Sequence, residues 1–518
     1  MKLTNWIDNF FVQRQYLLYL LLFAVAFNLF TFFHLDPTFA DPDSFYHAKM
    51  AETLAKKGAI TEFPWLSATD LKNNFVDHHF LYHLILIPFV KLYPPLIGLK
   101  IATIIFASLV VLTIFWFLRQ LKIKGAFWYV LFLLTINPFI FRLNLAKAQQ
   151  LVLILLFFLI YFLFRRNYLA LILIACLYVW LYGGWPLVFL VVLIYSFISW
   201  FWLFRQNSGV LFKIGKLKVY SQNFLLIISA ALGILAGIFF SPYFPKNLEF
   251  YWQQSFKIAI FNYQYLIGVG GEWYPYPFFD LFLAAIPFFV LYIFSLAVFI
   301  IFNKKQSMNS WFFLILSLMF FALTLKSRRY VEYFVPLAVC FSAIALSVWF
   351  DFIKPKLIKL FSLRLLLLSP LIIFLVLSPI IFRDLKLIKE SYHLGFAFDK
   401  FAEPTAWLVE NSNQGEIVFH SDWDEFPLLF YHNDKNYYLV GLDPTFMYLY
   451  DRDLYQRWVD ITLGESNDNL YQTIRDVFGA KYVFVDINQN SDFDRNLANN
   501  FYFKKVFENE EARIYKLE

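Results

Sequence analysis

Acidic and histidine side chains gather in the first polar stretch of the chain, which follows an apolar run at 15–33. The string "FADPDSFYHAKMAETL" carries Asp41 and Asp43, and "VDHHFLYH" carries His78 and His79. Carboxylates and imidazoles are common ligands of divalent metals, and an oxygen-rich set favours Mg or Mn. Such a metal would neutralise charge on a diphosphate leaving group. These side chains therefore predict a Mn or Mg site.

The same side chains also have simpler explanations. Asp41 and Asp43 precede "SFYHAKMAETLAKK", and an aspartate at that place accepts hydrogen bonds from the free amides at the start of a helix. His78 and His79 also fit ordinary solvated loop residues. Capping and metal binding are compatible for the two acids, so both interpretations stay open. The same loop also contains His47, Asp77 and His83.

The elements that must hold these residues are membrane helices. Of the 518 residues, 60% are hydrophobic and only 16% are charged, a balance that excludes a soluble domain of this size. A bilayer core needs about 20 apolar residues per spanning helix. About eleven such runs occur, at 15–33, 97–119, 125–141, 149–164, 167–183, 184–203, 222–241, 276–302, 308–325, 330–352 and 365–382. The expected fold is a polytopic α-helical membrane domain over 1–382, followed by a polar domain over 383–518.

The charged loops predict the orientation of this membrane domain. Lys2 and Arg14 precede or flank the first run and alternate loops further along are basic, which places the N-terminus in the cytoplasm. This agreement requires that the short run at 79–93 does not span. The odd number of spans then puts the C-terminal domain outside, at the plasma membrane of a prokaryote or in the endoplasmic reticulum lumen of a eukaryote. Because the basic loops explain much of the net charge of +7, no nucleic acid partner is expected.

Two short external segments break this charge pattern. Arg142 and Lys147 lie in 141–149, and Arg328 and Arg329 lie in 326–330. Long basic side chains that only reach for lipid head groups would explain them. Arginine also binds phosphate through its fork of donors, so two clusters on one face favour a phosphorylated lipid as ligand. The residues leave both explanations open.

The remaining external segments are the loops 34–96 and 242–275. The second ends in "GVGGEWYPYPFFDLF", where Glu272 follows two glycines. Glycines permit a mobile loop and close backbone approach. A carboxylate that simply lies at the membrane interface is the alternative.

Residues 383–518 differ in pattern from the rest of the chain. "AEPTAWLVENS" has the period of an amphipathic helix, whereas "EIVFH", "NYYLVG", "KYVFVD" and "ARIYKL" have the pattern of strands. The pattern predicts a small extracytoplasmic α/β domain. Its aromatic stretch around Trp423 would either face the membrane or pack in the core, as aromatic residues usually do.

The order of these motifs resembles the catalytic subunit of oligosaccharyltransferase, in the C-type glycosyltransferase superfamily. "DSFYH" resembles the acidic string after the family's first helix, "YGGWPLVFL" its W-G-G-Y string, and "GVGGEWYPYPFFDL" its S-V-S-E-H-Q-P-T string. "KSRRYVEYFVPLAV" resembles its external arginine segment, and "HSDWDEFPLLFYHNDKNYYLVGLD" resembles its W-W-D-Y-G region. The resemblance covers most of the chain in the same order, although each motif is degenerate.

The resemblance implies a glycosyltransferase that moves a glycan from a polyisoprenyl-diphosphate lipid to an extracytoplasmic acceptor, which in the family is a protein asparagine. The donor lipid, a protein or glycan acceptor and the bilayer are the implied partners, and a single subunit is plausible. The implied roles are catalysis by Asp43 and Glu272, metal binding by Asp43, Asp41, His78 and His79, diphosphate binding by Arg142, Lys147, Arg328 and Arg329, and acceptor binding by Trp423 and Asp424.

Some positions depart from the family pattern. Gln149 and Leu151 stand where the family carries an acidic pair, and Lys147 lies close by. Either Asp77 or the adjacent histidine pair completes the metal site, or Lys147 replaces the charge of the metal. Three other functions stay open: a C-type transferase that uses a lipid monophosphate sugar and a hydroxyl acceptor, a non-catalytic binder of lipid-linked glycans, and a transporter of lipid-linked sugars.

Overall fold

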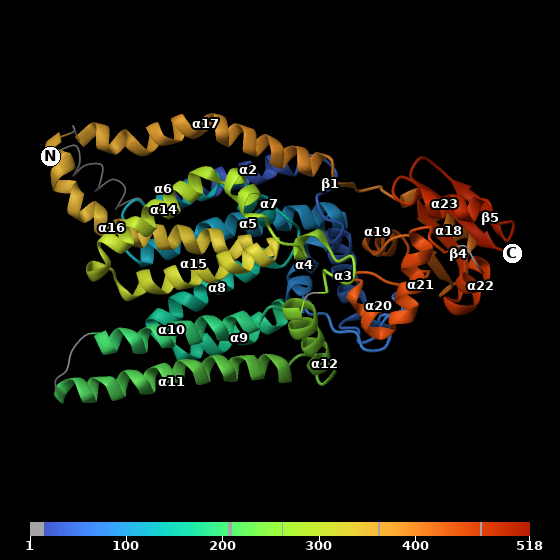
Figure 1. Cartoon of the computed structure of the whole chain (residues 1–518), viewed down its shortest axis with the longest axis horizontal. Helices are drawn as coiled ribbons and strands as arrows, with labels where there is room; N and C mark the ends of the chain where they lie inside the picture. The colour runs from blue at the N-terminus through green and yellow to red at the C-terminus, as the bar shows by residue number, and fades with distance from the viewer. Residues whose placement is uncertain (1–14, 206–209, 262, 361–362, 467–468) are drawn as a thin grey trace. The chain divides into compact units, whose positions relative to one another are not determined.

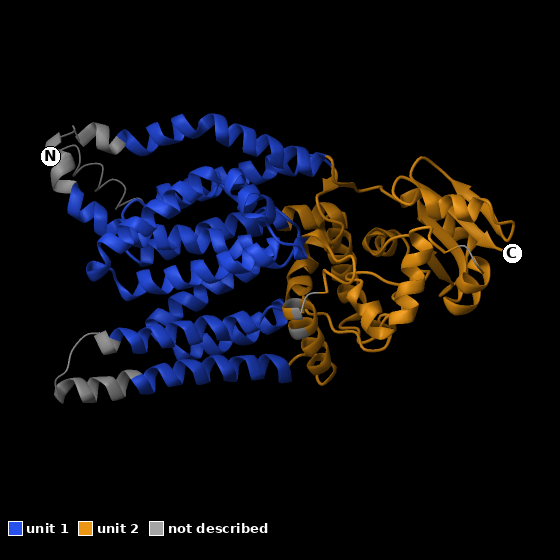
Figure 2. Cartoon of the chain, in the orientation of Figure 1, with its two compact units in different colours: residues 1–36, 103–239, 272–393 blue, residues 37–102, 240–271, 394–518 orange. Residues whose placement is uncertain are grey.

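The computed structural model describes residues 15–205, 210–261, 263–360, 363–466 and 469–518. Lys2 and Arg14, which support the predicted orientation, lie outside the described residues. Two compact units, distinguished by colour in Figure 2, divide the chain. Unit 1 comprises Met1–Asp36, Thr103–Phe239 and Glu272–His393, and unit 2 comprises Pro37–Ala102, Phe240–Gly271 and Leu394–Glu518. Each unit therefore joins segments that lie far apart in the sequence.

Unit 1 is a bundle of apolar helices (Figure 1). Because lipid offers no hydrogen bonds, apolar runs of this kind must satisfy their backbone groups as helices. Neighbouring helices pack along their lengths, notably α9 with α11, α15 with α16, and α14 with α16. In chain order the helices are α2 (Gln15–Phe33), most of α5 (Pro95–Gln120), α6 (Ala126–Leu133), α7 (Asn137–Leu143), α8 (Gln149–Arg165), α9 (Tyr168–Leu181), α10 (Pro186–Arg205), α11 (Val210–Phe239), α13 (Phe278–Ala284), α14 (Ile286–Ile301), α15 (Met308–Lys326), α16 (Val331–Leu360) and α17 (Leu363–His393).

Among the described residues, five helices are long and apolar enough to cross a membrane, or up to seven if each of two bent pairs counts as one span. The bent pairs are α6 with α7, at 78°, and α13 with α14, at 102°. A proline at the start of α7 and of α14 accounts for each break, since proline cannot continue the preceding helix. The chain is therefore a multi-pass membrane protein. The predicted apolar runs all fall on helices, whereas the count of eleven spans and the orientation stay predictions.

Unit 2 contains a four-stranded sheet of order β3-β4-β6-β5. Strand β3 (Ile417–His420) is parallel to β4 (Ala480–Asp486), and β6 (Ala512–Leu517) is antiparallel to both β4 and β5 (Phe503–Glu508). A short pair, β1 (Thr38–Phe39) with β2 (Phe396–Ala397), joins the first loop to the C-terminal segment. The helices α18 (Ala402–Asn411), α19 (Phe426–His432), α20 (Thr445–Tyr450), α21 (Arg452–Thr462) and α23 (Ser491–Ala498) complete this part of the unit.

Most of the predicted elements of this C-terminal part are present, and one strand is wrong. The helix at 402–412 and the strands at 416–420, 481–486 and 512–517 correspond to α18, β3, β4 and β6. The residues predicted as a strand at 436–441 make only isolated bridges, from Tyr438 to Leu66 and from Tyr437 to Ile417. Tyr438 N–H donates to Trp65 O at 2.9 Å, while Tyr437 O accepts from Val418 N–H at 2.8 Å. The strand β5 was not predicted, since "FKKVFE" lacks an apolar alternation.

The first loop contributes two helices to unit 2. Helix α3 (Asp43–Lys57) packs against both α4 (Phe80–Leu92) and α19. At 13 residues, α4 is shorter than the about 20 residues that a span needs. The helix α12 (Lys246–Trp252) comes from the second long loop.

Candidate active site

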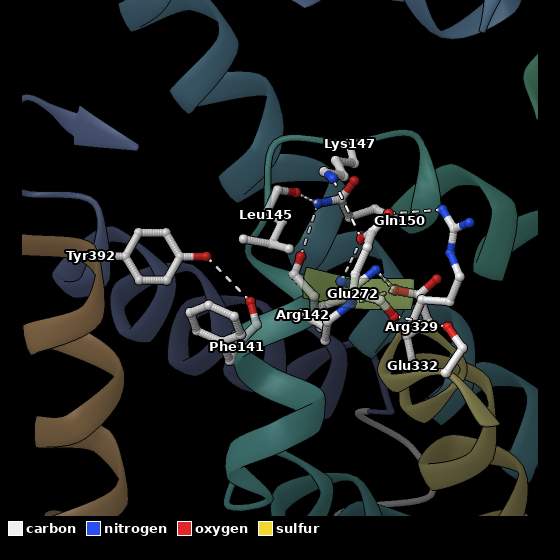
Figure 3. A network of polar contacts seen from close by, with 11 residues as sticks. Phe141, Arg142, Leu145, Lys147, Gln150, Glu272, Arg329, Glu332 and Tyr392 are labelled. Atoms are coloured by element: carbon white, nitrogen blue, oxygen red, sulfur yellow. Dashed lines mark hydrogen bonds and ion pairs between the residues drawn. The ribbon is translucent and has the colours of Figure 1, made fainter. Parts of the chain in front are cut away.

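Five charged side chains of unit 1 meet at one place, which we call the buried charge cluster (Figure 3). Arg142 lies in the last turn of α7, and Lys147 lies in the loop between α7 and α8. Arg329 belongs to the 3₁₀ turn η5 (Arg328–Tyr330), and Glu332 follows in the first turn of α16. Glu272 lies in the 3₁₀ turn η3 (Gly271–Trp273). The break that ends α6 and starts α7 is thus what brings Arg142 to the end of a span.

The carboxylate of Glu272 is the centre of this cluster. Arg142 Nη1 donates to Glu272 Oε2 at 2.7 Å, and Arg329 Nη2 donates to Glu272 Oε1 at 3.0 Å. Lys147 Nζ lies 3.5 Å from Glu272 Oε2. Glu332 Oε2 accepts from Arg142 Nε at 3.2 Å. Three cations therefore face two carboxylates, which leaves the cluster with an excess of positive charge.

Burial strengthens the interactions between the charges of this cluster. The side chains of Arg142 and Lys147 are each 9% exposed and that of Glu332 is 2% exposed. Burial opposes ionisation of Glu272, but the neighbouring Lys147, Arg329 and Arg142 outweigh it and hold the pKa of this carboxyl well below its usual range. Charges interact more strongly in such a poorly hydrated place than in water. The cluster is therefore an array of three cations around the ionised Glu272, with Glu332 as a second acid beside Arg142.

The cluster retains unused hydrogen-bonding capacity. Arg329 Nε and Arg142 Nη2 are buried and make no hydrogen bond, although Arg142 Nη2 lies 3.2 Å from Glu332 Oε2 as an ion pair. Buried donors normally have a partner, so each exception calls for an explanation. An anion with several oxygens, such as a phosphate, would supply the acceptors that these donors lack.

Two hydrogen bonds to backbone carbonyls anchor the segment that carries Glu272. Ser327 Oγ donates to Glu272 O at 2.8 Å, and Arg328 N–H donates to Tyr274 O at 3.0 Å. The guanidinium of Arg329 lies 4.0 Å from the ring centroid of Trp273, a cation–π contact. The residues from Glu272 onward therefore contact the segment between α15 and α16. The mobile loop that the glycines before Glu272 predict stays a prediction.

Gln150 shapes the loop that carries Lys147. Its Nε2 donates to Leu143 O at 2.9 Å and also to Leu145 O. A carboxylate at this position has no N–H to donate and would face two carbonyl oxygens. Gln150 directly follows Gln149, one of the two residues that stand where the resemblance calls for acids. Gln149, which departs from the family pattern, is therefore next to Gln150, whose side-chain amide holds the loop between α7 and α8.

The acids and histidines of the first loop belong to unit 2. Asp41 Oδ1 accepts the N–H of Asp43 at 2.9 Å, at the first residue of α3. Asp41 therefore satisfies one amide at the start of this helix, although the N-cap residue is Pro42 and its side chain makes no capping hydrogen bond. The rings of His78 and His79 lie 4.0 Å apart, and His78 stacks on Phe250 at 5.3 Å. All four predicted ligands are partly buried.

The structure joins other side chains of the same loop into a buried chain. His83 Nδ1 and Asp77 Oδ2 are 2.7 Å apart, and His83 Nε2 and His47 Nδ1 are 2.8 Å apart. Both ring nitrogens of His83 are thus engaged, one by Asp77 and the other by His47. The three side chains are buried. This chain links the helices α3 and α4 one turn after Asp43.

A metal site does not follow from these contacts. Within neither unit do the described residues bring together three or more His, Cys, Asp or Glu side chains in a way that could hold a metal ion. We therefore derive no chemical step through a metal. The predicted Mn or Mg ion stays a prediction.

The predicted acceptor residues lie in the 3₁₀ turn η6 (Trp423–Glu425) of unit 2. The Asp422 side chain accepts the Trp423 N–H at 2.6 Å, and Glu425 Oε2 accepts the Asp422 N–H at 3.0 Å. Burial, reinforced by Asp422, raises the pKa of Asp424, and burial raises the pKa of Glu425 to about 8. Trp423 and Asp424 are partly buried. Their role toward an acceptor stays a prediction.

Among the four predicted diphosphate-binding residues and Glu272, the structure brings four together and leaves one outside the cluster. Arg142, Lys147, Glu272 and Arg329 meet in the cluster, whereas Arg328 is exposed and donates through Nε to Pro275 O at 3.2 Å. Glu332 was missed, although a single acid inside an apolar run is costly in lipid and signals a buried partner. The Asp77–His83–His47 chain was missed because the adjacent histidine pair had been preferred.

No protein-family model and no curated protein sequence matches the chain. Solved structures do match. Oligosaccharyltransferase AglB from Archaeoglobus fulgidus, in complex with an inhibitory peptide and a dolichol-phosphate, has a TM-score of 0.65 at 13% identity, covering 98% of this chain and 75% of that one. The A. fulgidus oligosaccharyltransferase tethered with an acceptor peptide that contains the NVT sequon has a TM-score of 0.64, also at 13% identity, over 98% and 74% of the two chains.

A further match extends the comparison to another transferase. Arabinofuranosyltransferase AftD from Mycobacteria has a TM-score of 0.53 at 11% identity, covering 96% of this chain and 40% of that one. At these identities the similarity concerns the fold. The chain has the fold of oligosaccharyltransferase AglB, a resemblance that the order of its motifs predicted.

Proposed function

We propose that this chain is a membrane glycosyltransferase, which transfers a glycan from a polyisoprenyl-diphosphate lipid to an extracytoplasmic acceptor. The observation that carries the proposal is the buried charge cluster, where three cations surround one carboxylate and two arginine donors lack hydrogen-bond partners. Such an array suits the phosphate oxygens of a lipid donor. The matched AglB structures contain a dolichol-phosphate in one case and an acceptor peptide in another, which supports both kinds of partner.

In the proposed reaction the acceptor nucleophile attacks the anomeric carbon of the sugar with inversion. The bond from that carbon to the phosphate oxygen breaks, and the lipid diphosphate leaves with both electrons of the bond and takes up the proton that the nucleophile loses. Arg142, Lys147 and Arg329 stabilise the charge that develops on the leaving group, because they are already positioned before the reaction. Asp43 is proposed to orient the nucleophile, and Glu272 to close over the site.

The remaining parts of the proposal concern the acceptor and the membrane. Trp423 and Asp424 bind the acceptor, which is a protein asparagine in the first form of the proposal. The reaction takes place on the external face of the plasma membrane, where the C-terminal domain over 383–518 also lies. One subunit carries the activity.

The test is transfer by the purified full-length protein from a radiolabelled polyprenyl-diphosphate oligosaccharide to an Asn-x-Thr peptide. We expect labelled glycopeptide with the unchanged protein and a loss of at least about 100-fold with Asp43→Ala. Glu62→Ala is the matched control, because Glu62 is an exposed acid of the same loop, and it should retain activity. Equal activity of Asp43→Ala and the control would contradict the assignment of Asp43.

A second form of the function is favoured by the match to AftD. In this form the donor is a polyprenyl-monophosphate sugar and the acceptor is a hydroxyl of a glycan. Binding of the diphosphate donor without peptide modification would direct the search to hydroxyl acceptors. Donor binding without transfer to any acceptor would leave a non-catalytic binder of lipid-linked glycans.

A further inference from the structure

The buried charge cluster contains one lysine, Lys147, beside its two arginines. A diphosphate leaving group needs positive charge beside it, which a divalent ion on acidic ligands can supply. In this chain Gln149 and Leu151 stand where the family resemblance calls for those acids. Two residues before the first of them, Lys147 places an ammonium group inside the cluster.

The position of Lys147 is well defined by its neighbours. Lys147 Nζ lies 3.5 Å from Glu272 Oε2, the same oxygen that accepts from Arg142 Nη1 at 2.7 Å. Its side chain is 9% exposed. The loop beneath it is held by the two hydrogen bonds that Gln150 Nε2 donates to backbone carbonyls. The ammonium is therefore held by a formed structure rather than by a flexible surface loop.

The same surroundings do not suit a divalent cation. Glu272 already has three cationic partners, so a metal on this carboxylate would stand beside Arg142 and Lys147 and be repelled by both. Glu332, the other acid of the cluster, is held by Arg142 at 3.2 Å. The described residues of unit 1 offer no group of three acid, histidine or cysteine ligands. The chemistry of this set of side chains favours phosphate and disfavours a metal.

We infer that the ammonium of Lys147 supplies, together with Arg142 and Arg329, the positive charge that a metal ion would supply, so the donor phosphate binds at this cluster without a divalent metal. The inference rests on the proposed function, because it assumes that the cluster binds the donor. A lysine ammonium binds phosphate as a compact charge with three donors, while arginine adds paired donors. Arg329 Nε makes no hydrogen bond, and Arg142 Nη2 has only its ion pair with Glu332 Oε2 at 3.2 Å. These are the donors that the phosphate gains.

The test is calorimetric titration of the full-length protein in detergent with farnesyl diphosphate, in EDTA and in Mn. We expect dissociation constants that agree within about twofold between the two conditions. Lys147→Gln should weaken binding at least about tenfold in both, because a charge-assisted contact to phosphate is lost, and Lys147→Arg should stay close to the unchanged protein. Lys386→Gln is the matched control, since Lys386 is 78% exposed in the same unit.

The outcomes separate this inference from the proposed function. Binding that requires Mn, or that Mn tightens by about tenfold or more, overturns the inference and leaves the proposed function standing. Binding by Lys147→Gln as tight as that of the unchanged protein also overturns it. Absence of binding in both conditions overturns the inference and the proposed donor site together. The comparison of EDTA with Mn uses the unchanged protein, so it decides the matter even if Lys147→Gln does not fold.

Discussion

Replacing Glu272 by glutamine should change stability and ligand affinity in opposite directions. The carboxylate accepts two charge-assisted hydrogen bonds, from Arg142 at 2.7 Å and Arg329 at 3.0 Å, and forms an ion pair with Lys147 at 3.5 Å. Glutamine keeps the shape and one acceptor oxygen but removes the negative charge. Without a ligand, the three cations then repel one another with less compensation.

The magnitude follows from these contacts. A hydrogen bond to a charged group contributes about 1.5–3 kcal/mol, and the Glu272 side chain is 21% exposed, so water offsets part of the loss. We expect Glu272→Gln to lower the free energy of unfolding by about 2 kcal/mol. Because the carboxylate occupies the place of an anion among the cations, its removal should tighten farnesyl diphosphate binding by about ten- to thirtyfold.

The assay is thermal unfolding in detergent, followed by tryptophan fluorescence, with and without farnesyl diphosphate. A loss of about 2 kcal/mol in a chain of 518 residues corresponds to a melting temperature lower by about 2 °C, and saturating ligand should restore it. Glu390→Gln is the matched control, because Glu390 is 52% exposed and pairs with Lys386 at 3.6 Å, and it should change stability by less than about 0.5 kcal/mol. An unchanged melting temperature, or weaker ligand binding by Glu272→Gln, would refute the role given to this carboxylate.

Three further predictions test the surroundings of the site. Asp77→Asn should lower the free energy of unfolding by about 2–4 kcal/mol, since the buried carboxylate partners His83 at 2.7 Å; a melting temperature equal to that of the unchanged protein would contradict this. Burial raises the pKa of Glu425 from 4.5 to about 8, so its contribution to stability is fully present below pH 4.5 and is lost as the pH rises toward 8. The melting temperature of Glu425→Gln should therefore change less with pH than that of the unchanged protein. Parallel curves for the two proteins would contradict this prediction. Gln150→Glu should cost about 2–3 kcal/mol in a thermal melt and weaken farnesyl diphosphate binding through displacement of Lys147, and unchanged affinity would show that the amide does not hold this loop.

The sequence alone predicts two kinds of element. They are the helices that lie in lipid and the segments whose apolar residues repeat with the period of a helix or a strand. An apolar run such as Pro95–Gln120 must be helical wherever its neighbours lie, because lipid cannot pair its backbone groups. The strand "KYVFVD" at 481–486 and the helix at Ala402–Asn411 carry local patterns strong enough to be recognised alone. The sequence also predicts Arg142 and Arg329 as binding residues, since basic side chains at the external end of a membrane span need a partner.

The partners of those residues depended on the folded arrangement. Glu272 is 130 residues from Arg142 and 57 from Arg329 in the chain, and no local pattern encodes a contact across such separations. The residues around Tyr437 form two isolated bridges in place of the predicted strand, one through Tyr437 and one through Tyr438, to segments far away in the sequence. The sequence predicts the kinds of side chain that could do chemistry. The packing of α7, η3, η5 and α16 decides which of these side chains meet in the buried charge cluster. Such long-range contacts form only when several elements are in place at once.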